Sequence, residues 1–239
     1  MRCTLRPPDR PGDLMNDYAP SQGCDTSNMV MVHNLFRHLF TQARPLIQAV
    51  PDGDCPQARV VTSHLREITH ALSDHHTTED NLLWDDLEAR APGCALHVGQ
   101  MRAQHAAVAV LIEELEDVLP EFESTASADS RRSVMAAFDT IRTTLLLHVG
   151  DEENDILPVA STTLTQAEWD RLGEAGRSKI SPDRRFVQLG WILASMSAED
   201  GKQWIRQNLP LPARLAYSTL GRRQFAHERR RLAPPPTLA

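Results

Sequence analysis

The sequence predicts an all-α protein, an up-down-up-down four-helix bundle followed by a C-terminal helical extension. Residues that favour helix, chiefly Leu, Ala, Glu, Arg and Gln, dominate its 239 residues, and only 5% of them are aromatic. Four successive segments also carry apolar residues at alternating spacings of three and four, which is typical of helices that bury one face. Helices of this kind, joined by short connections, form an antiparallel bundle.

The chain begins with a segment that is expected not to fold. Residues 1–24 should form a disordered arm, because the stretch Arg-Pro-Pro-Asp-Arg-Pro-Gly buries too little apolar surface to offset the entropy of ordering. Residues 25–27 then supply N-cap side chains for the first helix. That helix is expected to end near residue 50, before a Pro-Asp-Gly-Asp turn.

Each of the other three bundle helices is expected to stop just before a proline, at Pro92, Pro120 or Pro158. Their expected ranges are about residues 57–90, 96–119 and 131–157. The bundle domain then spans residues 25–160, and residues 161–239 form the helical extension with its basic tail.

Histidine or glutamate interrupts the apolar stripe of all four helices. A carboxylate buried without a partner is costly, yet the second and fourth helices both carry His-x-x-x-Glu on the stripe. At this spacing the two side chains project from one face, one turn apart, and reach a shared metal centre. The candidate metal ligands are His33, His75, Glu79, His105, His148 and Glu152.

The alternating directions of the helices give a second reason to group these residues. In an up-and-down bundle the starts of the first and third helices lie level with the ends of the second and fourth. At a rise of about 1.5 Å per residue, all the candidates then fall in a layer roughly 15 Å thick. Unrelated core histidines would have no reason to agree in height.

The donor set favours a pair of iron ions. The candidate donors are too many for one zinc ion, which takes about four ligands, and calcium or magnesium would prefer oxygen ligands throughout. Mixed His and Glu side chains that face into a helical bundle are typical of carboxylate-bridged iron or manganese pairs. We expect two iron ions in an Fe–O–Fe unit bridged by Glu79 and Glu152, with manganese as the alternative. An open position would accept O₂, peroxide or NO.

Charge and composition exclude several classes of protein. The formal net charge of −7 argues against a protein built to bind nucleic acid. No run of about 18 apolar residues predicts a membrane-spanning helix, and the first residues lack the apolar core of a targeting segment. The four cysteines show no C-x-x-C pairing, which favours free thiols and a cytoplasmic location.

Four short motifs follow one another around the candidate ligands. They are Asp25-Thr26-Ser27-Asn28-Met29-Val30-Met31-Val32-His33, His75-His76-Thr77-Thr78-Glu79-Asp80 with Leu83-Trp84, Gln104-His105, and Leu147-His148-Val149-Gly150-Asp151-Glu152-Glu153. In this order, over about residues 25–160, they resemble the hemerythrin HHE family of cation-binding proteins. The tail resembles a family subgroup with a helical extension. The resemblance implies a diiron four-helix bundle that holds its metals through the candidate ligands.

The histidines depart from the family in one respect. Oxygen-carrying hemerythrins use five histidines arranged three and two, whereas this chain has four on its stripes and only His105 on the third helix. Met101 and Ala109, one turn to either side of His105, supply no replacement. Both metals are then coordinatively open, which favours redox chemistry over reversible O₂ carriage. His76 and Glu153 lie beside the stripes and are expected as outer partners of the ligands.

The extension is expected to pack against the bundle. Residues 186–196 are candidates for a lid over the site or for a homodimer contact, and the sequence does not decide between these roles. The arginine-rich end, residues 215–232, is expected to be a solvated helix face rather than a contact with membrane or nucleic acid.

Three hypotheses for the function follow from the expected site. The first is a diiron oxidoreductase that decomposes peroxide or reacts with O₂ or NO, with no catalytic group beyond the metal centre. The second is a protein that binds, stores or senses O₂, NO or iron without turnover. The third is an oxidase in a biosynthetic pathway, which would require an organic pocket. Open coordination favours the first.

Overall fold

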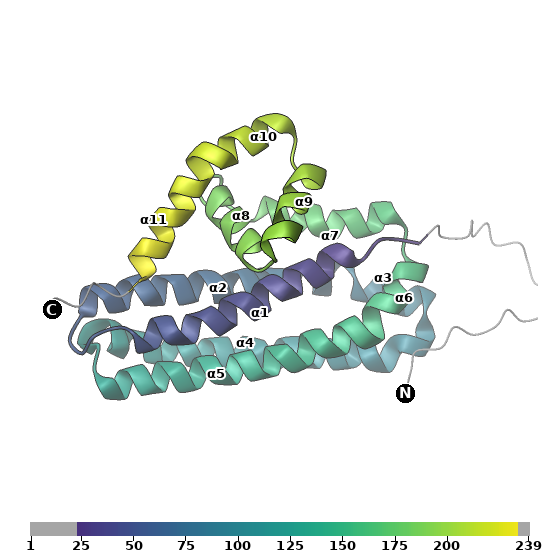
Figure 1. Ribbon diagram of the computed structural model, residues 1–239. Coiled ribbons are helices and arrows are strands. Elements are labelled where there is room, and N and C mark those ends of the chain that lie inside the picture. The colour runs from purple at the N-terminus through teal and green to yellow at the C-terminus, as the bar shows by residue number, and fades with distance from the viewer. Residues whose placement is uncertain (1–22, 234–239) are drawn as a thin grey trace, which may run out of the picture. The chain divides into compact units, whose positions relative to one another are not determined.

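The computed structural model describes residues 23–233, and all regular secondary structure in this range is helical, which confirms the predicted all-α class (Figure 1). Within it, three short segments depart from α geometry: the 3₁₀ turn η1 (Pro92–Cys94) and the π-helical η2 (Glu152–Ile156) and η3 (Tyr217–Gly221). The α-helices are α1 (Ser27–Gln48), α2 (Cys55–Leu82), α3 (Trp84–Arg90), α4 (Ala95–Thr125), α5 (Ala128–Asp151), α6 (Leu157–Thr163), α7 (Gln166–Ser178), α8 (Arg185–Ala194), α9 (Ala198–Asn208), α10 (Leu211–Ala216) and α11 (Arg222–Leu232).

The described chain divides into two compact units. The first comprises residues 23–30, 73–109 and 144–179, and the second comprises residues 31–72, 110–143 and 180–233. Helices α1, α2, α4 and α5 each contribute residues to both units, whereas α7 belongs to the first and α8 to α11 belong to the second. Among the described helices, each is too short or too polar to cross a membrane.

Two buried tryptophans anchor the core of the first unit. The side chains of Trp84 and Trp169 are almost fully buried, packed with apolar residues that include Leu87. The indole of Trp84 donates a hydrogen bond to Asp80 Oδ1 at 2.8 Å, and that of Trp169 donates to Asn28 Oδ1 at 2.7 Å. Both indole N–H groups thus have the partner that burial requires. The first of these bonds connects the core to Asp80, the residue after the candidate ligand Glu79.

In the second unit, α11 packs closely on α8. The ring of Phe225 meets that of Trp191 edge to face, with 4.9 Å between centroids. A Cβ atom at Gly190 would come within 2.3 Å of the Phe225 ring, so this close approach requires glycine. Elsewhere in the unit, Phe40 stacks on Phe138 at 4.7 Å. The extension therefore contributes apolar contacts of its own and is not a loose appendage.

Two predicted helix ends at prolines are wrong. Helix α4 continues through Pro120 to Thr125, because Leu119 and Phe122 are both fully buried and carry the apolar stripe past the proline. The chain also stays helical past Pro158. There η2 leads directly into α6, in which Pro158 occupies a first-turn position that needs no backbone N–H donor.

The second predicted helix is instead broken near its end. Helix α2 ends at Leu82 and α3 begins at Trp84. Between them Leu83 has φ −114° and ψ −51°, away from regular helix values. Leu83 and Trp84 are both fully buried, whereas a regular helix would point successive side chains about 100° apart. The break turns two consecutive large side chains into the core.

Part of the predicted arm and one cysteine, Cys3, lie outside the described residues. Gly23 and Cys24 are described, and the Cys24 N–H donates to the Ser161 carbonyl at 2.9 Å. The expectation of free thiols is confirmed for Cys24 and Cys55. It is wrong for Cys94, which is disulfide-bonded. The domain boundaries at residues 24 and 160 stay predictions.

Candidate metal centre

Three buried histidines from three helices form the first group of potential ligands. His76 lies on α2, His105 on α4 and His148 on α5, and each offers a ring nitrogen within 4.8 Å of the other two. The ring of His76 stacks on that of His105 at 4.0 Å, and the Nε2 atoms of His105 and His148 are 3.3 Å apart. Converging imidazole nitrogens of this kind suit a transition metal ion.

A second group adds carboxylates to histidine. Ligand atoms of His75, Glu79 and Glu152 lie within 4.8 Å of one another. His75 Nε2 is 3.2 Å from Glu79 Oε1, one helical turn along α2. Both glutamates are fully buried, with 0% of their surface exposed. Two carboxylates in such a dry position need compensating positive charge.

The two glutamates also contact the first group. Glu79 Oε2 lies 3.5 Å from His105 Nε2, and Glu152 Oε2 lies 3.6 Å from His148 Nε2. Glu79 and Glu152 therefore each lie close to one histidine of the first group and also to the other members of the second group. Carboxylates in this position can bridge two cations.

His33 lies on α1 and is fully buried, but it belongs to the second unit, whereas all the other candidates belong to the first. Its assignment as a ligand stays a prediction. Glu153 is half-buried in η2 beside Glu152, and it is absent from the ligand groups found in residues 23–233. Its expected role as an outer partner stays a prediction as well.

The electrostatics of Glu79 support a cation at this position. Burial, followed by the neighbouring charges of Glu152 and Asp80, raises the pKa of Glu79 well above its ordinary value. Neither carboxylate oxygen of Glu79 makes a hydrogen bond within the described residues. Burial lowers the pKa of His105, although Asp80 acts in the opposite direction. The lowered pKa favours the neutral imidazole, which is the form that binds metal. The residues present fit a metal pair.

Hydrogen bonds from outside the two groups orient two of the histidines. Asp80 Oδ1 lies 2.8 Å from His105 Nδ1, and Gln104 Oε1 lies 3.0 Å from His148 Nδ1. Gln104 Nε2 in turn donates to Asp151 Oδ2 at 2.8 Å. When Nδ1 carries the proton in these bonds, Nε2 is left with its lone pair toward the centre.

Sequence reasoning expected His76 only as an outer partner of the ligands and assigned no role to Gln104. It placed His76 beside the stripe, yet His76 joins His105 and His148 in the first group. The available signal was its i, i+3 spacing to Glu79, which also brings two side chains to one face. Gln104 was noted only as the neighbour of His105, and nothing in its own pattern marked its bond to His148.

The polypeptide changes its winding at the candidate ligand Glu152. Glu152 is the first residue of the π-helical segment η2, which follows α5 directly. Such segments insert an extra residue into a helix and are frequent at functional sites. Here the widened turn begins at Glu152, one turn after His148 on regular helix.

A third group of potential ligands is a different kind of site. His64, Glu67 and Glu228 also offer atoms within 4.8 Å of one another. However, Arg184 already joins both carboxylates, with Nη2 at 2.6 Å from Glu67 Oε2 and 2.9 Å from Glu228 Oε1. A protein cation therefore supplies the charge that a metal would supply, and we assign no metal to this group.

Comparison with known families identifies the larger part of the chain. The model of the hemerythrin HHE cation binding domain matches residues 24–160. Neither the comparison with curated proteins nor that with solved structures gives a match.

Proposed function

This chain belongs to the hemerythrin HHE family of cation-binding proteins, and on this basis we propose that it is a non-heme diiron protein that acts on O₂, peroxide or NO. Membership implies the binding of cations, typically iron. The observation that carries the proposal is the position of Glu79, which lies 3.2 Å from His75 and 3.5 Å from His105. One carboxylate between two groups of nitrogen donors is what a pair of cations requires.

The proposed ligands fall into two sets that share the glutamates. One ion would be held by His33 and His75, the other by three histidines, and both carboxylates would bridge. Iron or manganese accepts such mixed donors, and iron is our assignment. We further propose that α1, α2, α4 and α5 present these side chains as an up-down-up-down bundle. The full set is His33, His75, His76, Glu79, His105, His148 and Glu152.

Burial of the proposed ligands favours small diatomic or peroxide ligands over an organic substrate. The exposed fraction is 5% for His76 and His105 and 0% for the two glutamates and His148. When bound, an iron pair would supply redox chemistry toward such ligands. The chain's own residues hold the metals, orient the imidazoles and exclude water. An oxidase for a large organic molecule would need a more open site.

One observation favours the alternative, reversible binding of O₂ without turnover. His76 raises the number of histidines in the proposed set from four to five, the number that oxygen-carrying hemerythrins use. The inference that both metals are open depended on four histidines. With His76 as a ligand, at most one ion keeps an open coordination position. A binding or sensing role then explains the site as well as redox turnover does.

Reactivity assays separate the two candidates. The iron-loaded protein should be mixed with peroxide, with NO, and with O₂ in the presence of a reductant. Sustained turnover of any of these supports an enzyme. A reversible spectral change on O₂ or NO without turnover supports the binding protein, and the absence of both responses contradicts the proposed function.

The ligand assignment has a separate test. We expect His76→Gln to reduce the bound iron from two ions to one, because the first group would lose one of its three imidazoles. His227→Ala is the matched control, since His227 is exposed on α11 and should leave metal content unchanged. Full iron content in the His76→Gln protein would remove His76 from the set of ligands.

A further inference from the structure

The last part of the described chain is basic in an otherwise acidic protein. Residues 211–233 contain six arginines and one glutamate, a net charge of +5, whereas the whole chain carries −7. The charge of the protein is therefore distributed asymmetrically, with a basic segment on an acidic chain. The protein should approach a negatively charged surface with this segment first.

Four of these arginines have no carboxylate partner. Within residues 23–233, Arg231 pairs with Glu228 at 3.0 Å, but Arg222, Arg223, Arg229 and Arg230 take part in no ion pair. Elsewhere in the chain many arginines are paired, so an unpaired cluster on one helix is not explained by the general charge balance. Their guanidinium groups are available to an external anionic partner.

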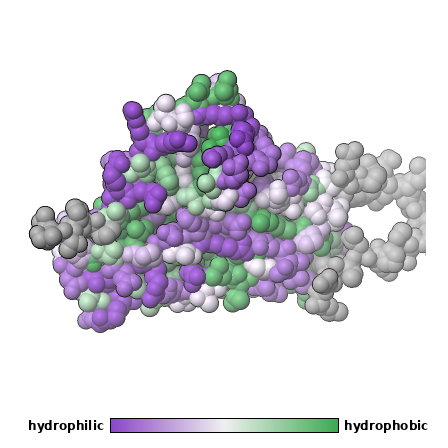
Figure 2. Space-filling model, viewed as in Figure 1, coloured by the Kyte–Doolittle hydropathy of each residue, from purple (hydrophilic) through white to green (hydrophobic). Residues whose placement is uncertain are grey.

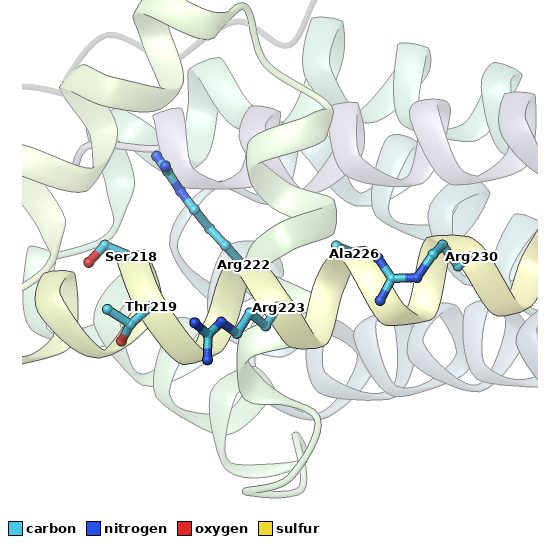
Figure 3. A pocket seen from close by; sticks show the side chains of 6 residues that line it. All are labelled: Ser218, Thr219, Arg222, Arg223, Ala226 and Arg230. Carbon is cyan, nitrogen blue, oxygen red and sulfur yellow. The ribbon is translucent and has the colours of Figure 1, made fainter.

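Three of the arginines border a shallow hollow. It measures about 350 Å³ and is lined by Arg222, Arg223 and Arg230 together with Ser218, Thr219 and Ala226. Figure 3 shows all of them on the one helix that runs from η3 into α11, with the guanidinium groups reaching away from its axis. The Ser218 and Thr219 hydroxyls donate to the Leu215 carbonyl, so they do not form a fixed cradle for a single phosphate.

Exposed leucines precede the arginines on the same segment. Leu211 is 65% exposed, Leu215 is 62% exposed and Leu220 is 53% exposed. Figure 2 shows apolar surface beside strongly hydrophilic surface where α10 lies in Figure 1. Exposed leucines next to unpaired arginines are typical of segments that lie on a membrane surface, with apolar side chains entering the headgroup boundary.

The opposite side of the segment is fixed to its own unit. Phe225 packs on Trp191 and Glu228 is held by Arg184, while Gln57 Nε2 donates to the Arg231 carbonyl at 3.2 Å. The arginines therefore stand on an anchored helix. A surface held in place in this way loses little conformational entropy when a partner binds.

We propose that residues 211–230, called here the arginine face, bind the surface of an anionic lipid bilayer. The arginines would meet lipid phosphates, and the leucines would enter the headgroup region. A nucleic acid would satisfy the arginines but would offer nothing to three exposed leucines. The absence of a fixed phosphate cradle fits a diffuse surface of many headgroups, since each basic residue contributes separately.

Vesicle binding tests this proposal with the full-length protein. Co-sedimentation should be measured with vesicles of phosphatidylglycerol and phosphatidylcholine in equal parts, and with vesicles of phosphatidylcholine alone. We expect binding only to the anionic vesicles. Since each basic residue near such a surface contributes about 1 kcal/mol, the double substitution Arg222→Glu and Arg223→Glu should weaken it by at least roughly 30-fold. The control is the double substitution Arg171→Glu and Arg177→Glu on α7, where both side chains are exposed. This control protein should lose less than half as much vesicle affinity, on a logarithmic scale, as the Arg222 and Arg223 variant.

Leucine replacement separates lipid from other anions. Leu211→Ser with Leu215→Ser should weaken vesicle binding while leaving the retention of the protein on a heparin column unchanged. Failure to sediment with anionic vesicles overturns the proposal. So does tight binding of an oligonucleotide that vesicles cannot displace, because the partner would then be a nucleic acid.

Discussion

Asp80 and Gln104 give two neighbouring histidines partners of different charge. Asp80 places a carboxylate 2.8 Å from His105 Nδ1, whereas Gln104 places a neutral amide oxygen 3.0 Å from His148 Nδ1. A carboxylate partner makes an imidazole the stronger donor to a metal. Of the two histidines, His105 should therefore contribute more to iron affinity, and its strength should depend on Asp80.

The substitution Asp80→Asn tests this at the scale of one side chain. It keeps an oxygen for the His105 and Trp84 hydrogen bonds but removes the charge. We expect iron affinity to fall about 10- to 100-fold, with little change in the unfolding free energy of the metal-free protein. Competition with a chelator measures the affinity. Asp85→Asn, at an 89% exposed side chain, is the control, and equal affinities in the two variants would contradict the role of Asp80.

At the residue scale the sequence picked out the buried candidate ligands on the stripes better than the residues around them. His75 and His148 could be found because a polar side chain on an apolar stripe is conspicuous. His76 was placed outside the stripe because a stripe marks only one line of the helix. In the structure His75 belongs to the second group of potential ligands, whereas the adjacent His76 belongs to the first. Gln104 could not be found, since its role depends on the distance between α4 and α5.

At the scale of elements, α7 is held by a salt bridge at its start. Thr165 and Glu168 form a reciprocal capping box, and Nη1 and Nη2 of Arg90 donate to Glu168 at 2.8 and 2.6 Å. The bond from Arg90, followed by that from the Thr165 N–H, lowers the pKa of Glu168 from 4.5 to about 2. A lowered pKa in the folded state stabilises the protein above the pKa of the unfolded chain.

The stabilisation by Glu168 should therefore be complete well above pH 4.5 and be lost as the pH falls toward 2. The difference in unfolding free energy between the native protein and Glu168→Gln, measured in urea, should shrink over this interval. Glu174→Gln, at an exposed position on the same helix, should show no such trend. A difference that stayed constant from pH 6 to roughly pH 3 would contradict this account of the cap.

Arg184 joins α2 and α11 through Glu67 and Glu228. Its removal would leave the partly buried carboxylate of Glu67 without its cation and that of Glu228 with Arg231 alone, so Arg184→Ala should destabilise the protein by about 2–3 kcal/mol. Iron content should not change, because the proposed iron ligands do not include any residue of this cluster. Thermal unfolding and metal analysis together check both parts. Arg185→Ala, at the exposed neighbouring position, should cost less than about 0.5 kcal/mol.

The helix boundaries show where tertiary packing overrides the local sequence preferences that predicted them. Proline predicted the ends of the third and fourth bundle helices, but buried Phe122 and the winding of η2 carry the chain beyond Pro120 and Pro158. The break at Leu83 has no proline or glycine to mark it. Helix class was predictable from periodicity, whereas these boundaries depend on side chains that meet only in the folded chain.

At the scale of the whole molecule, the buried carboxylates of the proposed site should lower the stability of the protein when no metal is bound. Glu79 and Glu152 bring two buried carboxylates together, which costs free energy until cations are bound. We expect Glu79→Gln to raise the unfolding free energy of the metal-free protein by about 1–2 kcal/mol while iron binding is lost. Denaturant unfolding in the presence of a chelator measures the first effect. Destabilisation by this substitution, relative to the exposed control Glu114→Gln, would contradict it.

The most direct test of the central claim is the metal content and optical spectrum of the full-length protein from iron-supplemented cells. The account predicts two iron ions per chain with oxo-to-iron charge-transfer bands in the near ultraviolet. No bound transition metal, even after anaerobic loading with iron, would mean that the histidines and glutamates form only a polar core.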